Sequence, residues 1–599
     1  MSDTPLPLTT AQSERALPAP PKPALSSPLS VKALFVWNDV RGRSAFAIRA
    51  SLCTAIPLLI GWLLGNEGAG LIASIGAFTG LYGEQLPYHK RAVLLAVTAL
   101  AFVLAITLGE LGTVTPFLGV VTVSIFAGVA VLIYNSLNVG RPGAYLLVMV
   151  CAMGTMIQSR GISITASLLL VLGGGLCAWC VQMVGYLIVP YGPQRRIILA
   201  AARAVQSLVK AMGKPTEDMS RHIAAAALQD AWEMLAGLPP ENPFQKLNRR
   251  INLVFSSTTR RDTAGDKLLS VCDALVREAR RLSPRKPRKD AESGDLLDQM
   301  NRRYVDEQLT NQHRRALDML KEGIVGPYSA PRRSAIRIAI ASFLAGIIGL
   351  YLGLTQAYWA MAAAALVLHQ SGGRTMLIQR GWQRLVGTLV GLATAELVIW
   401  IHPQGFWLVL VMTLCRYLTE MTIMRNYALA VIFITPSSLL IASTFTEAVG
   451  ALFFARAIDT LVGVACAALV LFTVATKDGE RRVPKEILQT LDAAEALLNQ
   501  LTTGDMYSRK VRRLQDRLRR RLISLRNAYD DAMNESKTIE KHVSSYWANV
   551  VRAQRLGYRI LALGWTAREG ASLNFGRMRQ MIALERARYQ ESDELFAQK

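Results

Sequence analysis

The chain has 599 residues, 51% of them hydrophobic, and a formal net charge of +24 at pH 7. Its length exceeds a single soluble core and its mean hydropathy of +0.27 is high for a soluble protein, so composition favours an integral membrane protein. The basic residues occupy loops and two long polar blocks, not one patch interleaved with aromatic side chains, which argues against a nucleic-acid partner. The seven cysteines are scattered and predict no disulfide framework.

Residues 1–40 predict a disordered cytoplasmic leader followed by an interfacial segment. Seven prolines fall within the first 30 residues, too many for a packed element, and the apolar core of a signal peptide is missing. Between Val31 and Val40, apolar residues and Trp37 recur at helical spacing. This pattern suits a short helix at the inner membrane face, although a plain linker explains the same residues.

Residues 41–193 predict a first membrane domain of six spans. The apolar runs lie at about 46–64, 69–82, 92–108, 114–134, 143–158 and 165–190. The second run is short for a span of about 20 residues, so we expect it to be tilted, broken or partly re-entrant. Lys and Arg cluster in the loops of one side, which predicts that both ends of this domain are cytoplasmic.

Two polar blocks, 194–331 and 477–599, predict cytoplasmic helical domains. Apolar residues recur in them at three- and four-residue spacing, for example over 268–282 and 296–323. The basic run 509–521 invites a nucleic-acid interpretation, but a solvated helix face near anionic lipid explains it better.

Residues 332–476 predict a second membrane domain of six spans. A constant shift of 288 residues aligns Arg49 with Arg337 and Ile60-Gly61 with Ile348-Gly349. Because each block has an even number of spans and begins inside, the repeats are parallel. The predicted fold is therefore an all-α membrane protein with two parallel six-helix transmembrane repeats, each followed by a cytoplasmic helical domain.

Charged residues at membrane depth are the candidate substrate or ion pathway, since such charges oppose insertion. They are Arg337, Glu396, Arg416, Glu420, Arg456 and Asp459. The spacings within the pairs Arg416–Glu420 and Arg456–Asp459 place opposite charges on one helix face, where they either staple helices together or contact a substrate. Tryptophans near the predicted span ends are interpreted as interface anchors. These are Trp359, Trp382, Trp400 and Trp407.

Nucleotide and metal motifs such as GxxxxGK[ST] and HExxH do not occur in the sequence. We therefore expect no enzyme, no catalytic residues, no metal and no cofactor, and an ATP-driven pump is disfavoured.

Several motifs of the second block resemble one known family. They are Tyr358-Trp359-Ala360, then Arg384-x-x-Gly387-Thr388-x-x-Gly391, then Arg425-Asn426-Tyr427 leading into Thr435-Pro436, and Arg456-x-x-Asp459-Thr460-x-x-Gly463. As a set they resemble fusaric-acid-resistance-type (FUSC) inner-membrane proteins, which include bacterial aromatic acid exporters and are related to plant aluminium-activated malate transporters. In the first block, GRPGAYLLVMVCAMGT at 140–155 stands where RNYALAVIFITP would be.

The resemblance implies an inner-membrane secondary exporter of small organic anions, namely aromatic carboxylic acids or related xenobiotics. It also implies a periplasmic adaptor on a separate chain, and it leaves a homo-oligomer open. Arginines at depth fit an anionic cargo, and Asp459 or Glu396 could carry a coupling proton. Two alternatives stay open: a passive organic-anion channel on the same fold, and a non-transporting membrane scaffold.

Overall fold

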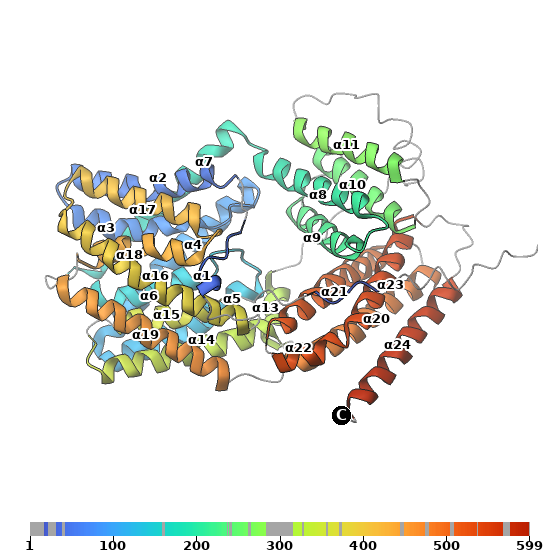
Figure 1. The fold of residues 1–599 in the computed structure, drawn as a ribbon. Helices are drawn as coiled ribbons and strands as arrows, with labels where there is room; N and C mark the ends of the chain where they lie inside the picture. Colours follow the sequence, from blue (N-terminus) through green and yellow to red (C-terminus); the bar gives the residue numbers. More distant parts are fainter. Residues whose placement is uncertain are drawn as a thin grey trace, which may run out of the picture. The chain divides into compact units, whose positions relative to one another are not determined.

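The computed structural model (Figure 1) forms two compact units. The membrane unit comprises residues 25–190 and 314–476, and the polar unit comprises residues 1–24, 191–313 and 477–599. Within both units the structure describes residues 17–21, 31–38, 42–157, 162–235, 238, 242–260, 265–282, 316–325, 329–354, 357–369, 374–443, 449–473, 478–503, 508–535, 537–566 and 575–597. Every regular element in these ranges is a helix.

The membrane unit contains twelve main helices in the part of the chain that the structure describes. The first six are α2 (Ser44–Leu63), α3 (Glu67–Gly76), α4 (Tyr88–Leu111), α5 (Pro116–Ser136), α6 (Tyr145–Ile157) and α7 (Ile164–Ile188). The second six are α14 (Ala330–Tyr351), α15 (Tyr358–His369), α16 (Arg374–Trp400), α17 (Phe406–Thr422), α18 (Tyr427–Ser443) and α19 (Val449–Thr473). Shorter elements are α1 (Val31–Leu34), η2 (Ala77–Leu81), η3 (Gly112–Val114) and α13 (Ala316–Val325).

Six of these helices are long and apolar enough to cross a membrane: α2, α4 with η3, α5, α7, α14 and α19. Shorter apolar helices are α3 with η2, α6, α15 and α18. The prediction of a membrane-embedded helical protein is thus confirmed. The expected break in the second apolar run is also present, because α3 ends at Gly76 and the chain continues as a 3-10 helix.

Helix pairs in the membrane unit recur between its two halves. In the first half α2 packs on α3, α3 on α7, and α4 on α6; in the second half α14 packs on α15, α15 on α19, and α16 on α18. The halves also exchange partners, since α5 packs on α14 and α17 packs on α2.

The α16–α18 contact is close because glycines face it. A Cβ on Gly387 would lie 2.6 Å from the Ala428 carbonyl oxygen, and a Cβ on Gly391 would lie 2.7 Å from Thr435 Oγ1. Pro436 lies inside α18, where it has no N–H to donate to the carbonyl one turn earlier. The Thr394 hydroxyl of α16 donates to the Gly391 carbonyl oxygen of its own helix at 2.9 Å and shares this proton with the freed Ile432 carbonyl oxygen at 3.3 Å.

The leader joins the membrane unit at the loop before α18. The Asn426 side-chain amide donates to the Leu34 carbonyl oxygen at 2.6 Å and to the Val36 carbonyl oxygen at 3.3 Å. The predicted helix over 31–40 is a single turn, α1, and residues 39–40 lie outside the described ranges. Helix α1 ends after one turn because the residues that follow it hydrogen bond to the loop before α18 through their backbone groups.

The polar unit is built from both polar segments. Its helices are α8 (Gly192–Ala211), α9 (Glu217–Leu235), α10 (Pro243–Arg260), α11 (Gly265–Arg281), α20 (Asp478–Thr503), α21 (Arg509–Met533), α22 (Lys537–Ser544), α23 (Trp547–Thr566) and α24 (Phe575–Ala597). One hydrophobic core includes Leu208 and Leu228 from the first segment with Leu525 and Val550 from the second. A 2.7 Å ion pair between Arg555 and Asp218 also joins the segments. Of the helix predicted over 296–323, residues 296–315 lie outside the described ranges.

Candidate functional site

Arg384 is buried in the membrane unit, where the first turns of two short helices meet it. It lies ten residues into α16, about 15 Å along the helix axis, and its side chain is 2% exposed. Its Nη1 donates to the Tyr427 hydroxyl at 3.3 Å, and Tyr145 lies within electrostatic range. Tyr145 and Tyr427 are the first residues of α6 and α18. The first residues of two helices, whose N-terminal ends carry partial positive charge, therefore lie beside a guanidinium that already carries a full positive charge.

Arg456 lies under the start of a third short helix, α15. It is 3% exposed, and its guanidinium carbon is 3.5 Å from the ring centroid of Trp359. Arg456 Nε and Nη1 have no hydrogen-bond partner. Trp359 is 2% exposed, so its prediction as an interface anchor is wrong: α15 has 12 residues, about 18 Å, and its first turn lies within the protein. Trp400 and Trp407, by contrast, are 76% and 64% exposed.

Asp459 lies one turn along α19 from Arg456 and is fully buried. Neither of its carboxylate oxygens has a hydrogen-bond partner, so no hydrogen bond joins it to Arg456. The two side chains are nevertheless close enough to interact electrostatically. The spacing placed the pair on one face correctly, but Arg456 stacks on the indole ring in preference to binding the carboxylate.

We call this cluster the arginine site. It consists of Tyr145, Tyr358, Trp359, Arg384, Tyr427, Arg456 and Asp459. Arg456 lies within electrostatic range of Arg384, Tyr145, Tyr358 and Asp459. Two buried cations thus lie near each other, one of them beside a carboxylate, with guanidinium donors left unpaired. Burial of these unpaired charges raises the free energy of the folded protein when the site is empty. A bound anion lowers that free energy because it supplies negative charge and hydrogen-bond acceptors.

Arg416 and Glu420 lie in a different place and take part in an ion-pair network. Arg416 Nη2 is 3.1 Å from Glu420 Oε1, as their spacing predicted. Arg43 Nη2 is 3.0 Å from Glu420 Oε2, and Arg43 Nη1 is 3.4 Å from Glu84 Oε2. Because Arg43 immediately precedes α2, this network joins α17 to the first half of the membrane unit. Arg43 and Glu84 were not among the predicted candidates, because their partners lie far away in the chain.

Two further candidates lie outside the arginine site. Glu396 is exposed on α16, four residues before its end. Arg337 is half-buried in the third turn of α14.

The remaining motif residues position helices. Gly387, Gly391, Thr435 and Pro436 form the α16–α18 contact, where Thr388 is also buried, with its hydroxyl unpaired. Asn426 Oδ1 accepts from the Leu429 N–H at 2.9 Å and so caps α18. Tyr145, the first residue of α6, was not among the predicted candidates.

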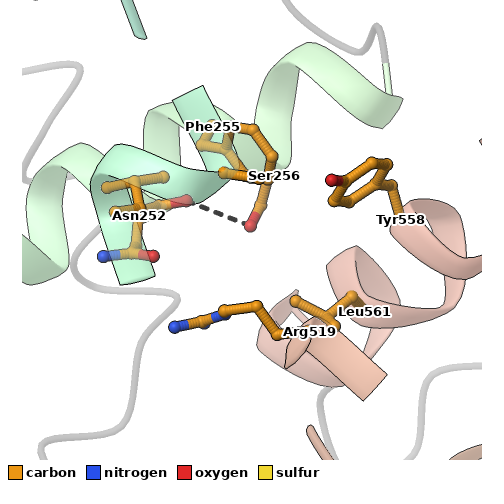
Figure 2. Close-up of a pocket in the computed structure, with 8 residues that line it drawn as sticks. Asn252, Phe255, Ser256, Arg519, Tyr558 and Leu561 are labelled. Atoms are coloured by element: carbon orange, nitrogen blue, oxygen red, sulfur yellow. Dashed lines mark hydrogen bonds between the residues drawn. The ribbon is translucent and has the colours of Figure 1, made fainter. Parts of the chain in front are cut away.

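A small cavity in the polar unit, lined in part by Asn252, Ser256, Arg519 and Tyr558, is not a substrate site (Figure 2). Its volume of about 10 Å³ suits about one water molecule. The Ser256 hydroxyl donates to the Asn252 carbonyl oxygen at 3.0 Å, and the Tyr558 hydroxyl has no partner. Among the residues described, no group of three or more His, Cys, Asp or Glu side chains could hold a metal ion.

Taken with its apolar helices, the buried cationic cluster defines a polytopic membrane protein with an internal polar site. Residues 344–470, which include most of the arginine site, match the family model described as "Fusaric acid resistance protein-like". This part of the membrane unit is thus similar to the FUSC family, as its motifs predicted.

One relative matches along nearly the whole chain. It is "Uncharacterized membrane protein YvaC" of Bacillus subtilis (strain 168), 24% identical over 596 residues, with 92% of this chain and 90% of the relative covered. No solved structure matches the chain.

Proposed function

We propose that the protein is a secondary efflux transporter of small organic anions and that the arginine site binds the anionic group. The observation that carries this proposal is a pair of buried arginines, Arg384 and Arg456, with unpaired guanidinium donors beside helix N-termini. A carboxylate would accept charge-assisted hydrogen bonds there and would complement the dipoles of α6 and α18. Discontinuous or short helices that point their N-termini at an anion are a known solution in membrane transporters.

Trp359 and the three tyrosines favour an aromatic cargo. An aryl ring can pack against their side chains in offset or edge-to-face geometry while the carboxylate reaches the guanidinium groups. Aromatic carboxylic acids and related xenobiotics are therefore the proposed substrate class.

Asp459 is the proposed proton carrier. It is fully buried beside Arg456, and neither of its oxygens has a hydrogen-bond partner. Proton-driven efflux requires exchange, so Asp459 would take up a proton after the anion has left and would release it before the next anion binds. Binding of anion and proton would thereby be coupled.

Two parallel six-helix repeats are part of the proposal. The recurrence of helix pairs in both halves and the exchange of α5 and α17 between them support it. We further propose residence in a bacterial inner membrane with both termini and the polar unit cytoplasmic, because Lys and Arg cluster in the loops of one side. A periplasmic adaptor and a homo-oligomer complete the proposed partners.

Transport by energised everted membrane vesicles tests the proposal, with radiolabelled benzoate as the probe. We expect benzoate accumulation that a protonophore abolishes. Arg456→Gln and Arg384→Gln should each lower the initial rate at least tenfold at equal protein abundance, because a hydrogen bond to a charged group contributes about 1.5–3 kcal/mol. Arg332→Gln, an exposed arginine at the start of α14, is the matched control and should stay within twofold of wild type.

The outcomes separate the alternatives. Benzoate flux that requires Arg456 but ignores the proton gradient would indicate a passive channel. Vesicles that move no benzoate in any variant would favour the scaffold interpretation.

A further inference from the structure

Five residues of the leader lie on the polar unit. Leu17–Pro21 have no regular secondary structure, and they contact the start of α23; Figure 1 draws them as an isolated dark blue segment. The indole Nε1–H of Trp547, the first residue of α23, donates a hydrogen bond to the Pro18 carbonyl oxygen.

The sequence of this segment, LPAPP, restricts it to one conformation. Pro18, Pro20 and Pro21 fix φ near −65°, and each residue that precedes a proline is held in the extended or polyproline II region. A polyproline II strand has no internal hydrogen bonds, so its carbonyl oxygens stay free to accept. Three of the five residues also lack an N–H, so docking leaves few donors without a partner.

The surface beneath the segment supplies what such a strand needs. Trp547 is 6% exposed, so its N–H requires an acceptor, and the Pro18 carbonyl provides one. The Tyr529 ring centroid is 4.9 Å from that of Trp547, and the Arg526 guanidinium carbon is 4.7 Å from the indole centroid. These neighbours fix the indole, and its N–H edge meets the leader. Aromatic surfaces of this kind recognise preformed polyproline II strands at low entropic cost.

We propose that Arg526, Tyr529 and Trp547 form a recognition site for a proline-rich segment and that Leu17–Pro21 of the same chain is its ligand. The site lies in the polar unit and is independent of the proposed transport function. We assign the chain's own leader as the ligand for two reasons. The segment lies on this site in the structure, and a covalently attached ligand has an effective concentration of the order of millimolar.

Photocrosslinking of the full-length protein tests the proposal. The photoreactive amino acid p-benzoylphenylalanine replaces Ala19, which is exposed on the docked segment. After irradiation, mass spectrometry should locate the crosslinks on α21 and the start of α23 within the same chain. Crosslinks predominantly on other helices, or a crosslinked dimer as the main product, would overturn the proposal.

Two variants test the recognition itself. Replacing Pro18, Pro20 and Pro21 by glycine removes the conformational restriction of the segment and leaves the helices unchanged. We expect the crosslink yield to fall at least fivefold. Trp547→Phe keeps an aromatic ring but removes the N–H, which should weaken docking about fivefold and lower the yield at least twofold.

The matched control replaces Pro5 and Pro7 of the same leader by glycine and should leave the yield unchanged. Because the triple glycine variant leaves the helical core intact, it gives a result even if Trp547→Phe folds poorly. A triple variant that crosslinks like wild type would contradict the proposal.

Discussion

Replacing Gly387 by alanine should destabilise the membrane unit, although alanine favours a helix. The added Cβ would lie 2.6 Å from the Ala428 carbonyl oxygen and 2.9 Å from Val431 Cβ, and backbone atoms of α18 cannot rotate away. Alanine gains about 1 kcal/mol of helix propensity over glycine, while overpacking costs about 1–3 kcal/mol. Separation of α16 from α18 would also weaken the Thr394 hydrogen bond to Ile432, which contributes about 1 kcal/mol. We expect a net loss of about 1–3 kcal/mol, and a larger one for Gly387→Leu.

The assay is thermal unfolding of the purified protein in detergent, and the control is Gly173→Ala on α7. A Cβ on Gly173 would meet no atom within 4 Å, so this variant should gain the higher helix propensity of alanine without a clash. The apparent melting temperature of Gly387→Ala should therefore lie below that of wild type, and that of Gly173→Ala at or above it. Equal melting temperatures for the two variants would refute the close-packing argument.

Three further predictions concern single side chains. Thr394→Val should lower the free energy of unfolding by about 1 kcal/mol in the wild-type background. The loss should be smaller in a Pro436→Ala background, because the Ile432 carbonyl oxygen then accepts from the N–H of residue 436. Equal losses in thermal melts of the two backgrounds would contradict this. Glu420→Gln should cost about 3–5 kcal/mol because two arginines lose their carboxylate, whereas Glu396→Gln, at an exposed position, should change the melting temperature little. Burial and the nearby Arg526 lower the pKa of His222 to about 4, so the unfolded state binds more protons between pH 6.5 and 4. The free energy of unfolding of the polar unit should then fall by at most about 3 kcal/mol over that range, and His222→Gln should flatten its pH dependence in chemical denaturation.

The apolar runs predicted the membrane helices to within a few residues, because the length and hydropathy of a span are local properties. The resemblance to a known family likewise rests on short motifs, such as Arg384-x-x-Gly387-Thr388-x-x-Gly391, which are recognisable without knowledge of the fold. The pairing of helices is different. Glu420 binds Arg43, 377 positions earlier in the chain, and nothing in either local sequence specifies that contact.

The arginine site was predictable in part. Arg456 and Asp459 were identified from their depth in an apolar run, but the stacking of Arg456 on Trp359 depends on how deeply the short α15 begins. Likewise, the amphipathic helices of the two polar segments each predicted a buried face without specifying its partner. Their shared core, with Leu228 and Leu525 in one cluster, follows from tertiary packing.

Equilibrium binding to the purified protein in detergent tests the central claim most directly. Titration calorimetry would compare benzoate with benzyl alcohol, which has a similar ring and no charge. If Arg384 and Arg456 bind the anionic group, benzoate should bind at least tenfold more tightly than benzyl alcohol, and the Arg384→Gln and Arg456→Gln variants should lose that preference. Equal affinity for the two compounds, or an undiminished preference in both variants, would contradict an anion site at these arginines.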